Sequence, residues 1–539
     1  MKEFKTEMLK IKNNKYTKQQ INFVENLVHK GESVTRSTMQ MCLEFGLNYS
    51  ENTGRRFRKI MQNLKVTNNV ARVEDTDTFK KAQNKQHNGL KKRFLVSWAQ
   101  SDTIVHKGFL KNIEAYAQEI NAEILICAGR YKNPTSLSSS KALKDKEKDV
   151  KNSWDSSVLT YLDANRHNLH KHLQLLSDVK IQPTASMPLS GMNSITGLES
   201  CIIGHPRVQL QSLPVMESYP HKLLLTTGAC TLPNYTDTAI GKKSEFHHQF
   251  GFVIVELDGE DFHVRQIVAD KKGDFFDLVF CAKNGVISKC GDGVPALIFG
   301  DLHLNEEDKV AVTTSFKMVE LLNPKNIFLH DLGNGHSVSH HEQKDPFIIL
   351  EREEDGSWSL QKELDNIVDW LNSYPQYNFI SVQSNHNEFI DRWLRNEDWR
   401  KTKNKKLYLE FSNVVANGLA PKGILAYYLK NHVTNLKSLG LDESYNVLGF
   451  ELGMHSHVGV HGSRSSPIQL KNLPMKSVVG HSHVPHRFDG SLSVGTLTKL
   501  RLSYNHGCSA WLHSNVVIYP NGKASHLNII NGKFTTLLS

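Results

Sequence analysis

Five short apolar runs in the second half of the chain each end in a cluster of aspartate, histidine or asparagine. Their length and composition predict buried β-strands. Helical patterns lie between some of the runs, for example over 359–373 and 388–396. This alternation predicts an α/β domain, layered in the α+β manner, and constrains the fold more than any other feature. The runs cover residues 295–299, 326–330, 378–382, 446–452 and 476–479.

The polar clusters behind these runs consist of metal-ligand residue types. In an open sheet, ligands bind at the carboxyl ends of the strands, so we expect the clusters to meet there. A lone Asp-x-His or His-x-His pair is usually a surface feature or a satisfied core group, but five clusters in order predict a metal centre. Imidazole with carboxylate suits manganese, iron, zinc or nickel. The clusters hold Asp301 and His303; His330 and Asp331; Asn385, His386 and Glu388; His455 and His457; and His481 and His483.

The order of these motifs resembles that of the calcineurin-like metallophosphoesterase superfamily over roughly residues 295–490. The resemblance implies a β-sandwich flanked by helices. It also implies two bound divalent cations, with Mn²⁺ the first choice and Mg²⁺, Fe²⁺, Zn²⁺ or Ni²⁺ as alternatives. His386 would stand beside the scissile phosphate as proton donor or charge stabiliser, and we expect it to be catalytic together with Asp331. Asp301, His303 and His483 would hold one ion, and Asp331 would bridge both ions. Asn385, His481 and a histidine of the fourth cluster would hold the second ion. That histidine is either His455 or His457, and His455 is slightly favoured because it comes first after its strand.

The sequence departs from that motif pattern at three positions. His330 replaces the usual glycine before Asp331, and Ser384 replaces the glycine before Asn385. Asn387 stands where an acid often follows the histidine. None of these changes removes an expected ligand, so they affect the surroundings of His386 rather than the reaction class.

Further stretches resemble a tailed-phage subgroup of these proteins. They are Thr227–Cys230, Ser339-His340-His341, His461–Arg464 and Arg130–Ser136. The resemblance implies that residues 94–290 belong to the same protein family. SbcD-type nucleases and the early host-DNA-degrading nucleases of large tailed phages would be nearest in role. His340, His341 and Arg464 are candidate substrate-binding residues, with ordinary loop residues as the alternative.

The basic excess lies entirely at the N-terminus. Residues 1–93 carry a net charge of +11, whereas the whole chain carries +10. Residues 17–64 read as three short helices, and the third holds Arg55, Arg56, Arg58 and Lys59. This plan fits a helix-turn-helix module that binds DNA through these four residues. Any small three-helix bundle, or a solubilising basic arm, is the alternative.

We therefore expect four regions. Residues 1–65 form the basic helical, helix-turn-helix-like module, and 66–92 form a polar linker. Residues 93–290 form a middle α/β region of unknown role that opens with a strand–helix–strand unit near 93–128. Residues 291–539 form the phosphoesterase domain.

The cysteines and the hydropathy bear on location. The seven cysteines are scattered without a CxxC pair, which indicates reduced thiols. No apolar run reaches the roughly 18 residues of a membrane span, and the first residues lack the apolar stretch of a signal peptide. We expect a cytoplasmic protein, in the host cytoplasm if the chain comes from a phage.

The leading functional hypothesis is a metal-dependent DNase that hydrolyses phosphodiester bonds with a hydroxide activated by two metals. A small-molecule phosphomonoesterase or cyclic-nucleotide phosphodiesterase is the alternative within enzymes, and a compact pocket would favour it. A DNA-binding scaffold with a non-catalytic metal site is a third hypothesis, against which the intact ligand set counts. The resemblance also implies a homo-oligomer.

Overall fold

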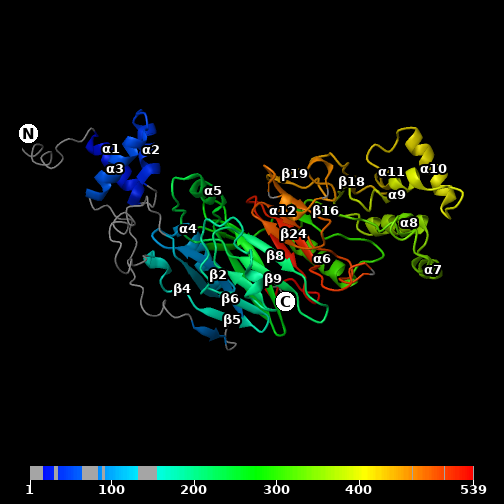
Figure 1. Ribbon diagram of the computed structural model, residues 1–539, viewed down its shortest axis with the longest axis horizontal. Helices are drawn as coiled ribbons and strands as arrows, with labels where there is room; N and C mark the ends of the chain where they lie inside the picture. Colours follow the sequence, from blue (N-terminus) through cyan, green and yellow to red (C-terminus); the bar gives the residue numbers. More distant parts are fainter. Residues whose placement is uncertain are drawn as a thin grey trace, which may run out of the picture.

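The computed structural model describes residues 16–29, 34–63, 83–87, 92–131, 154–463, 465–470, 472–502 and 504–537. They form a mixed α/β protein, as expected (Figure 1). None of the helices in these ranges has the length and hydropathy needed to cross a membrane. All seven cysteines fall within these ranges and are free thiols.

The N-terminal helices form a small bundle. The expected helices over 17–64 are confirmed as α1 (Lys18–His29), α2 (Val34–Glu44) and α3 (Glu51–Asn63). Apolar side chains from all three helices, including Val24, Met41 and Phe57, form its core because they recur with helical spacing. The opposite face of α3 is polar.

A six-stranded sheet carries three of the five expected strands. Parallel strands β15 to β18 form one side, and β24 joins β15 in the antiparallel sense. Helix α6 (Lys309–Leu322) connects β15 to β16, and α8 (Leu360–Asn372) precedes β17. The order is β18 (Leu436–Ser438), β17 (Phe379–Ser381), β16 (Ile327–Leu329), β15 (Ala296–Ile298), β24 (Ser514–Ile518) and β25 (Ala524–Asn528).

Strand alternation divides the side chains of this sheet between two cores. Leu297 and Phe299 point to the face covered by α6 and α8, whereas Ile298 points to the opposite face. On that opposite face Ile298 packs with Val478 and Leu492 of an eleven-stranded sheet. The two sheets thus form a sandwich with helices on its outer side. The other helices are α5 (Ala239–His247), α7 (Pro346–Glu354), α9 (Phe389–Asn396), α10 (Lys405–Ala416), α11 (Ile424–His432) and α12 (Pro467–Leu470).

The eleven-stranded sheet runs through the whole body of the protein. Its last five strands come from the expected phosphoesterase region and its first six from upstream. The order is β1 (Asn84–Gln86), β5 (Arg166–His170), β6 (Leu173–Leu176), β7 (Ser200–Ile203), β9 (Lys222–Thr226), β8 (Gln209–Leu213), β22 (His486–Phe488), β23 (Ser491–Ser493), β21 (Lys476–Val479), β20 (Phe450–Glu451) and β19 (Asn446–Val447).

Two expectations about local structure were wrong. The single strand expected over 446–452 is the hairpin β19–β20, because Leu448 and Gly449 take φ angles of 50° and 85° and turn the chain. Within the expected linker 66–92, Asn84–Gln86 form strand β1, which pairs with β5. The three side chains of β1 are exposed, so the strand pairs with the sheet edge through its backbone alone. The sequence therefore shows no apolar pattern that would predict it.

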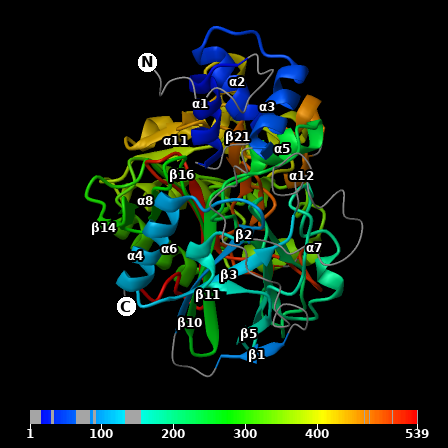
Figure 2. The ribbon, with the colours of Figure 1, turned by 90° about the vertical axis from the view of Figure 1, so that its left-hand side faces the viewer.

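The middle region forms a second sandwich. The expected strand–helix–strand unit is confirmed as β2 (Arg93–Gln100), α4 (Lys107–Glu119) and β3 (Glu123–Gly129), with β2 and β3 parallel. They belong to a five-stranded sheet that packs α4 on one face and the first part of the eleven-stranded sheet on the other. Figure 2 shows this end of the protein. The remaining strands are β4 (Leu162–Asp163), β10 (Gly251–Asp258), β11 (Asp261–Val268), β12 (Phe275–Asp277), β13 (Phe280–Lys283) and β14 (Val286–Lys289).

The expected boundary between 290 and 291 is crossed by hydrogen-bonded backbone. Strand β8 from the middle region pairs with β22 from the downstream region in the antiparallel sense. The boundary itself stays a prediction from the sequence. The continuous eleven-stranded sheet joins the middle sandwich to the downstream sandwich.

Candidate metal centre

The five polar clusters converge at one end of the downstream sandwich. Asp301 and His303 follow β15, Asp331 follows β16 and Asn385 follows β17. The remaining two clusters follow β20 and β21 of the facing sheet, so the site lies where strand ends from both sheets meet. Asp301, His303, Asp331, His455 and His483 are buried, and Asn385 and His481 are half-buried.

One part of the cluster joins two carboxylates with two imidazoles. His303 Nε2 lies 3.3 Å from Asp331 Oδ2, and His483 Nε2 lies 3.2 Å from Asp301 Oδ2. The Nε2 atoms of His303 and His483 are 3.1 Å apart. Asp301, His303, Asp331 and His483 each offer one ligand atom within 4.8 Å of the others, a spacing that can hold a metal ion.

A second part of the cluster contacts the same oxygen of Asp331. His455 Nε2 is 3.2 Å from Asp331 Oδ2 and 3.1 Å from Asn385 Oδ1. His481 Nδ1 is also 3.1 Å from Asn385 Oδ1. Asp331 therefore touches both parts of the cluster, the position that the family resemblance implies for a bridging ligand.

His455 and His457 occupy different surroundings. His455 contacts Asp331 and Asn385, as above. His457 Nε2 lies 3.6 Å from Glu388 Oε2, and its ring is 6.3 Å from that of His481. The geometry therefore favours His455 over His457 as a ligand.

The carboxylates are held in the charged form. Burial alone would raise the pKa of Asp331, but the neighbouring histidines, His455 first, outweigh it and lower its pKa well below the ordinary value. In the same way, burial opposes and His483 and His455 favour ionisation of Asp301, whose pKa is also lowered. Two ionised carboxylates in a buried site require a compensating positive charge.

Several observations fit a cation as that compensating charge. Asp301 Oδ1, Asp331 Oδ1 and His483 Nδ1 are buried with no hydrogen-bond partner. A Cβ atom on Gly480 would lie 2.2 Å from Asp301 Oδ1 and 2.9 Å from His455 Nδ1, so only glycine leaves room here. The donor set of carboxylate, imidazole and amide suits Mn²⁺ or a related divalent ion.

The comparison with known proteins places the chain in a family. It is 30% identical over 470 residues to "Protein A1" of Escherichia phage T5, which covers 82% of this chain and 83% of that protein. The chain belongs to the Protein A1 family. No family profile matches the chain, and no solved structure matches it. The phage part of the sequence resemblance is thereby confirmed, while the metallophosphoesterase superfamily stays a prediction.

Two residues of this A1-family protein contact the expected ligands although the sequence assigned neither of them a role at the site. His330 Nδ1 lies 3.2 Å from His455 Nδ1, and Asp301, His330 and His455 form a second group able to hold a metal. Asn334 Oδ1 lies 2.8 Å from His303 Nδ1. Asn334 follows the His330-Asp331 motif by three residues, which is the only signal in the sequence that could have pointed to it.

His386 lies beside the cluster with one ring nitrogen already engaged. Its Nδ1 donates to the carbonyl oxygen of Asn334 at 3.1 Å, and its ring is 4.4 Å from that of His303. Burial, with His303 next, lowers the pKa of His386 to about 3, so the ring is neutral at neutral pH. Because Nδ1 carries the proton, Nε2 is the atom available to a substrate.

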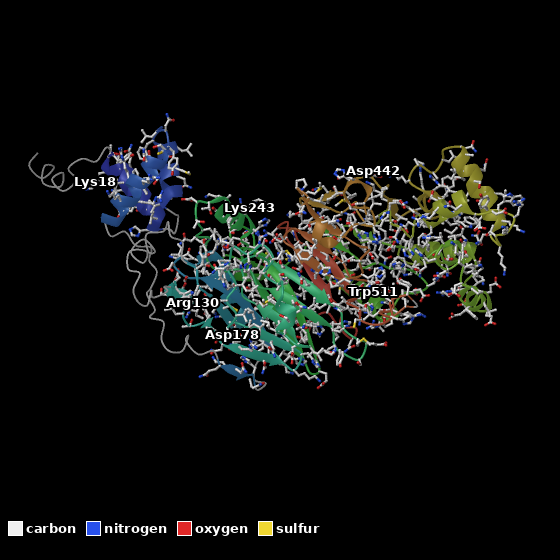
Figure 3. The ribbon with its side chains drawn as sticks, viewed as in Figure 1. Lys18, Arg130, Asp178, Lys243, Asp442 and Trp511 are labelled. Atoms are coloured by element: carbon white, nitrogen blue, oxygen red, sulfur yellow. The ribbon has the colours of Figure 1, made fainter. Side chains whose placement is uncertain are left out.

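A cavity of about 1050 Å³ opens over the cluster. Asp331, Asn385, His386, His481 and His483 form its floor. Its walls carry charged residues of both signs, among which Glu306 pairs with Arg352 and Lys499, and the aromatic side chains of Tyr504 and Trp511. The Trp511 ring stands 4.1 Å from the His483 ring. Trp511 is labelled in Figure 3.

The other predicted site residues lie outside the cluster. His341 lines the cavity, whereas His340 receives a hydrogen bond from Arg392 at 3.4 Å on the surface. Arg464 lies outside the described residues. On α3, Arg55, Arg56 and Lys59 are exposed and Arg58 is half-buried, which leaves a basic face on the bundle.

Proposed function

We propose that this protein is a metal-dependent DNase of the metallophosphoesterase type. The observation that carries the proposal is the buried cluster of Asp301, His303, Asp331, His455 and His483, assembled from the ends of strands in two sheets. A merely structural role would not need a large cavity above two buried carboxylates. Membership of a phage protein family agrees with an enzyme that acts during infection.

The cluster would hold two divalent cations, Mn²⁺ first. Asp301, His303 and His483 belong to one site, His455, Asn385 and His481 to the other, and Asp331 to both. Such ions supply Lewis acidity to a phosphate and lower the pKa of a bound water. The carboxylates hold that charge in place, and the protein walls limit access of bulk water.

The residues around the cluster orient the substrate in this proposal. His386 lies beside the phosphate and, when protonated at Nε2, acts as proton donor or charge stabiliser. Lys499, about three-fifths exposed at the cavity wall, offers a charge to a phosphate oxygen. Trp511 and the exposed Tyr504 offer surfaces on which bases stack, as in other proteins that bind single strands.

The basic bundle favours DNA over a small phosphate ester. The cavity of about 1050 Å³ has a size that admits either substrate. The basic face of α3 would add sequence-independent contacts to the DNA backbone. We also propose that the protein acts in the host-cell cytoplasm. The proposal that it forms a homo-oligomer rests on the family resemblance alone.

The experiment compares three substrates. Plasmid DNA, mononucleotides and bis-p-nitrophenyl phosphate are each incubated with protein and Mn²⁺, Mg²⁺ or EDTA. We expect DNA breakdown that EDTA and Asp331→Ala both abolish. Turnover of small esters with intact plasmid would contradict the DNase and favour the phosphomonoesterase. No turnover of any substrate would leave a DNA-binding scaffold.

A further inference from the structure

The two sandwiches of this chain have the same topology. The five-stranded sheet has the order β11-β10-β2-β3-β4, and the six-stranded sheet has β25-β24-β15-β16-β17, followed by the extra strand β18. In both, the first three strands are antiparallel neighbours and the last three are parallel. Helix α4 lies between β2 and β3 in the chain, as α6 lies between β15 and β16.

The eleven-stranded sheet repeats the same relation. Its halves run β5-β6-β7-β9-β8 and β19-β20-β21-β23-β22, with matching parallel and antiparallel pairs. The halves meet where β8 pairs with β22 in the antiparallel sense. Antiparallel pairing of equivalent strands is what a two-fold axis between two copies produces. The equivalent strands β11 and β25 also touch, through Ser525 Oγ and the Gln266 carbonyl at 2.8 Å.

Short backbone bridges support the correspondence residue by residue. Val105 pairs with Thr231 as Glu307 pairs with Thr498, both antiparallel. Ala229 pairs with Phe250 as Thr496 pairs with His513, both parallel. The helices that follow begin at equivalent N-caps, His106 and Asp308. After β7 the chain reads Gly204–Arg207, Gly-His-Pro-Arg, where after β21 it reads Gly480–His483, Gly-His-Ser-His.

Among the described residues, the first copy lacks the two carboxylates of the metal cluster, because the strand registers place Ala99 and Ala128 at the positions of Asp301 and Asp331. A Cβ on Gly480 would meet Asp301, His330 and His455, but a Cβ on Gly204 would meet Cys127 at 2.5 Å and Trp98 at 2.7 Å. Cys127, which the strand registers align with His330, has its Sγ 3.3 Å from Ser177 Oγ.

Charged groups in the first copy also differ from those of the cluster. Arg207 stands in the place of His483 and pairs with Asp489 at 2.7 Å. Where the second copy has a cavity of about 1050 Å³, only about 10 Å³ remain beside Trp98, Lys180 and Gly204. Among the described residues, groups that can hold a metal occur only in the second copy. Figure 3 labels Arg130, at the end of β3 in the first copy, far from Trp511 in the second.

We infer that residues 93–290 are a second, metal-free copy of the sandwich that carries the site, and that this copy acts as a built-in partner of the metal-bearing one. The partner role rests on direct contacts to the segment that precedes Trp511, a residue of the cavity wall. Val215 exchanges two backbone hydrogen bonds with Ser509, at 3.0 and 2.9 Å. Ser212 Oγ donates to the Ala510 carbonyl at 2.9 Å. The segment held in this way leads directly into Trp511, which covers His483.

The metal-free state is tested by the Mn²⁺ content of the full-length protein after equilibration and desalting, measured by mass spectrometry of the metal. We expect two ions per chain in the unmodified protein, none in Asp301→Asn/Asp331→Asn, and two in Trp98→Phe. His481→Gln and its counterpart His205→Gln form a matched pair, of which only the first should lose metal. Mn²⁺ retained by the double variant, or lost from folded Trp98→Phe or His205→Gln, would overturn the inference. This result does not depend on DNase activity.

The partner role is tested by amide hydrogen exchange of the peptide around Ser509–Trp511. Val215→Pro removes one donor to this segment and should speed its exchange several-fold, while Val215→Ala keeps the donor and should leave the exchange unchanged. Equal exchange in both variants would overturn the partner role. Because exchange is measured without substrate, the outcome is separate from that of the nuclease assay.

Discussion

At the scale of single residues, the candidate centre is held in a strained backbone. His303, Asp331, His481 and His483 all have positive φ angles, between 45° and 73°. Non-glycine residues in this region cost on the order of 1–3 kcal/mol each and persist only where the surroundings impose them. Such strain is concentrated at functional sites, which agrees with a site selected for chemistry rather than for stability.

The two histidines of the fourth cluster should behave differently. His455→Ala should lower Mn²⁺ affinity by on the order of 100-fold or more, since even partners of ligands contribute about 10–100-fold. His457→Ala, next to Glu388, should change it by less than about threefold, because it removes no contact to Asp331. Mn²⁺ titration of each purified variant measures this. Equal losses would show that both side chains bind metal.

His330 should act by orienting His455. If His455 binds through Nε2, its Nδ1–H donates to His330 Nδ1 across 3.2 Å. His330→Leu should therefore reduce Mn²⁺ affinity by about 10–100-fold, the range for a ligand's hydrogen-bond partner. His330→Asn, which keeps an acceptor, should recover part of the loss. An unchanged affinity in His330→Leu would remove His330 from the site.

The cluster residues are predictable from the sequence because each follows an apolar run. The same pattern does not distinguish His455 from His457, since both lie close behind the same strand. Nor does it assign His330 or Asn334, whose roles depend on contacts with His455 and His303 that only the folded chain creates.

At the scale of elements, the loop between β21 and β22 is packed against the carboxylates. His481 N donates to Asp301 Oδ2 at 2.7 Å, and Gly480 lies beneath the cluster. Gly480→Ala should abolish Mn²⁺ binding, because its methyl group would lie 2.2 Å from Asp301 Oδ1. Gly291→Ala is the control, since nothing lies within 4 Å of its added methyl group. Full metal content in folded Gly480→Ala would contradict this geometry.

Strands β10, β11 and β12 share a buried ion network. Arg265 contacts Glu256 at 2.5 Å and Asp277 at 2.8 Å, and all three side chains are buried. Arg265→Leu should lower the free energy of unfolding by about 3–5 kcal/mol, because it leaves buried carboxylates uncompensated. Urea unfolding of the variant measures the loss, and a change below about 1 kcal/mol would contradict it.

The same network predicts how the stability of the fold changes with pH. Burial opposes ionisation of Glu256, but Arg265 outweighs it and lowers the pKa of Glu256 below its ordinary value. A lowered folded-state pKa stabilises the fold above the unfolded pKa of about 4.3, and this contribution is lost as pH falls through the folded pKa. The unmodified protein should therefore lose more stability than Arg265→Leu on acidification below about pH 4. Parallel pH profiles of the two proteins would contradict this.

Element prediction succeeded where the apolar signal was strong. Strands β15, β16, β17 and β21 and helices α8 and α9 lie where the apolar pattern put them. The hairpin β19–β20 was missed because its Leu-Gly turn lies inside an apolar run that resembles one strand. Strand β1 was missed because its three exposed side chains show no alternation of apolar and polar residues.

At the scale of the whole molecule, two sandwiches of one topology share a continuous sheet. This repeat is not readable from the sequence, because the ligand motifs that mark the second copy are absent from the first. Ala99 and Cys127 stand where Asp301 and His330 stand in the second copy. Topology alone reveals the repeat, since strand order survives changes that erase a motif.

The N-terminal bundle of α1, α2 and α3 should bind DNA phosphates through the basic face of α3. Replacing Arg55, Arg56 and Lys59 by glutamine should reduce the slope of log affinity for DNA against log salt by about 0.9 for each phosphate that is no longer neutralised. Lys430→Gln, an exposed change on α11, should leave the slope unaltered. The measurement is fluorescence anisotropy of labelled duplex DNA at several salt concentrations. An identical slope in the triple variant would leave the bundle without a role in DNA binding.

The central claim is that strand ends of two sheets assemble a two-metal centre around Asp331. Its most direct test is anomalous X-ray diffraction, at the manganese absorption edge, from crystals grown with Mn²⁺. We expect two anomalous peaks per chain, one on the side of Asp301, His303 and His483 and the other on the side of Asn385, His455 and His481, with Asp331 between them. Peaks elsewhere, or none at this cluster, would contradict the claim.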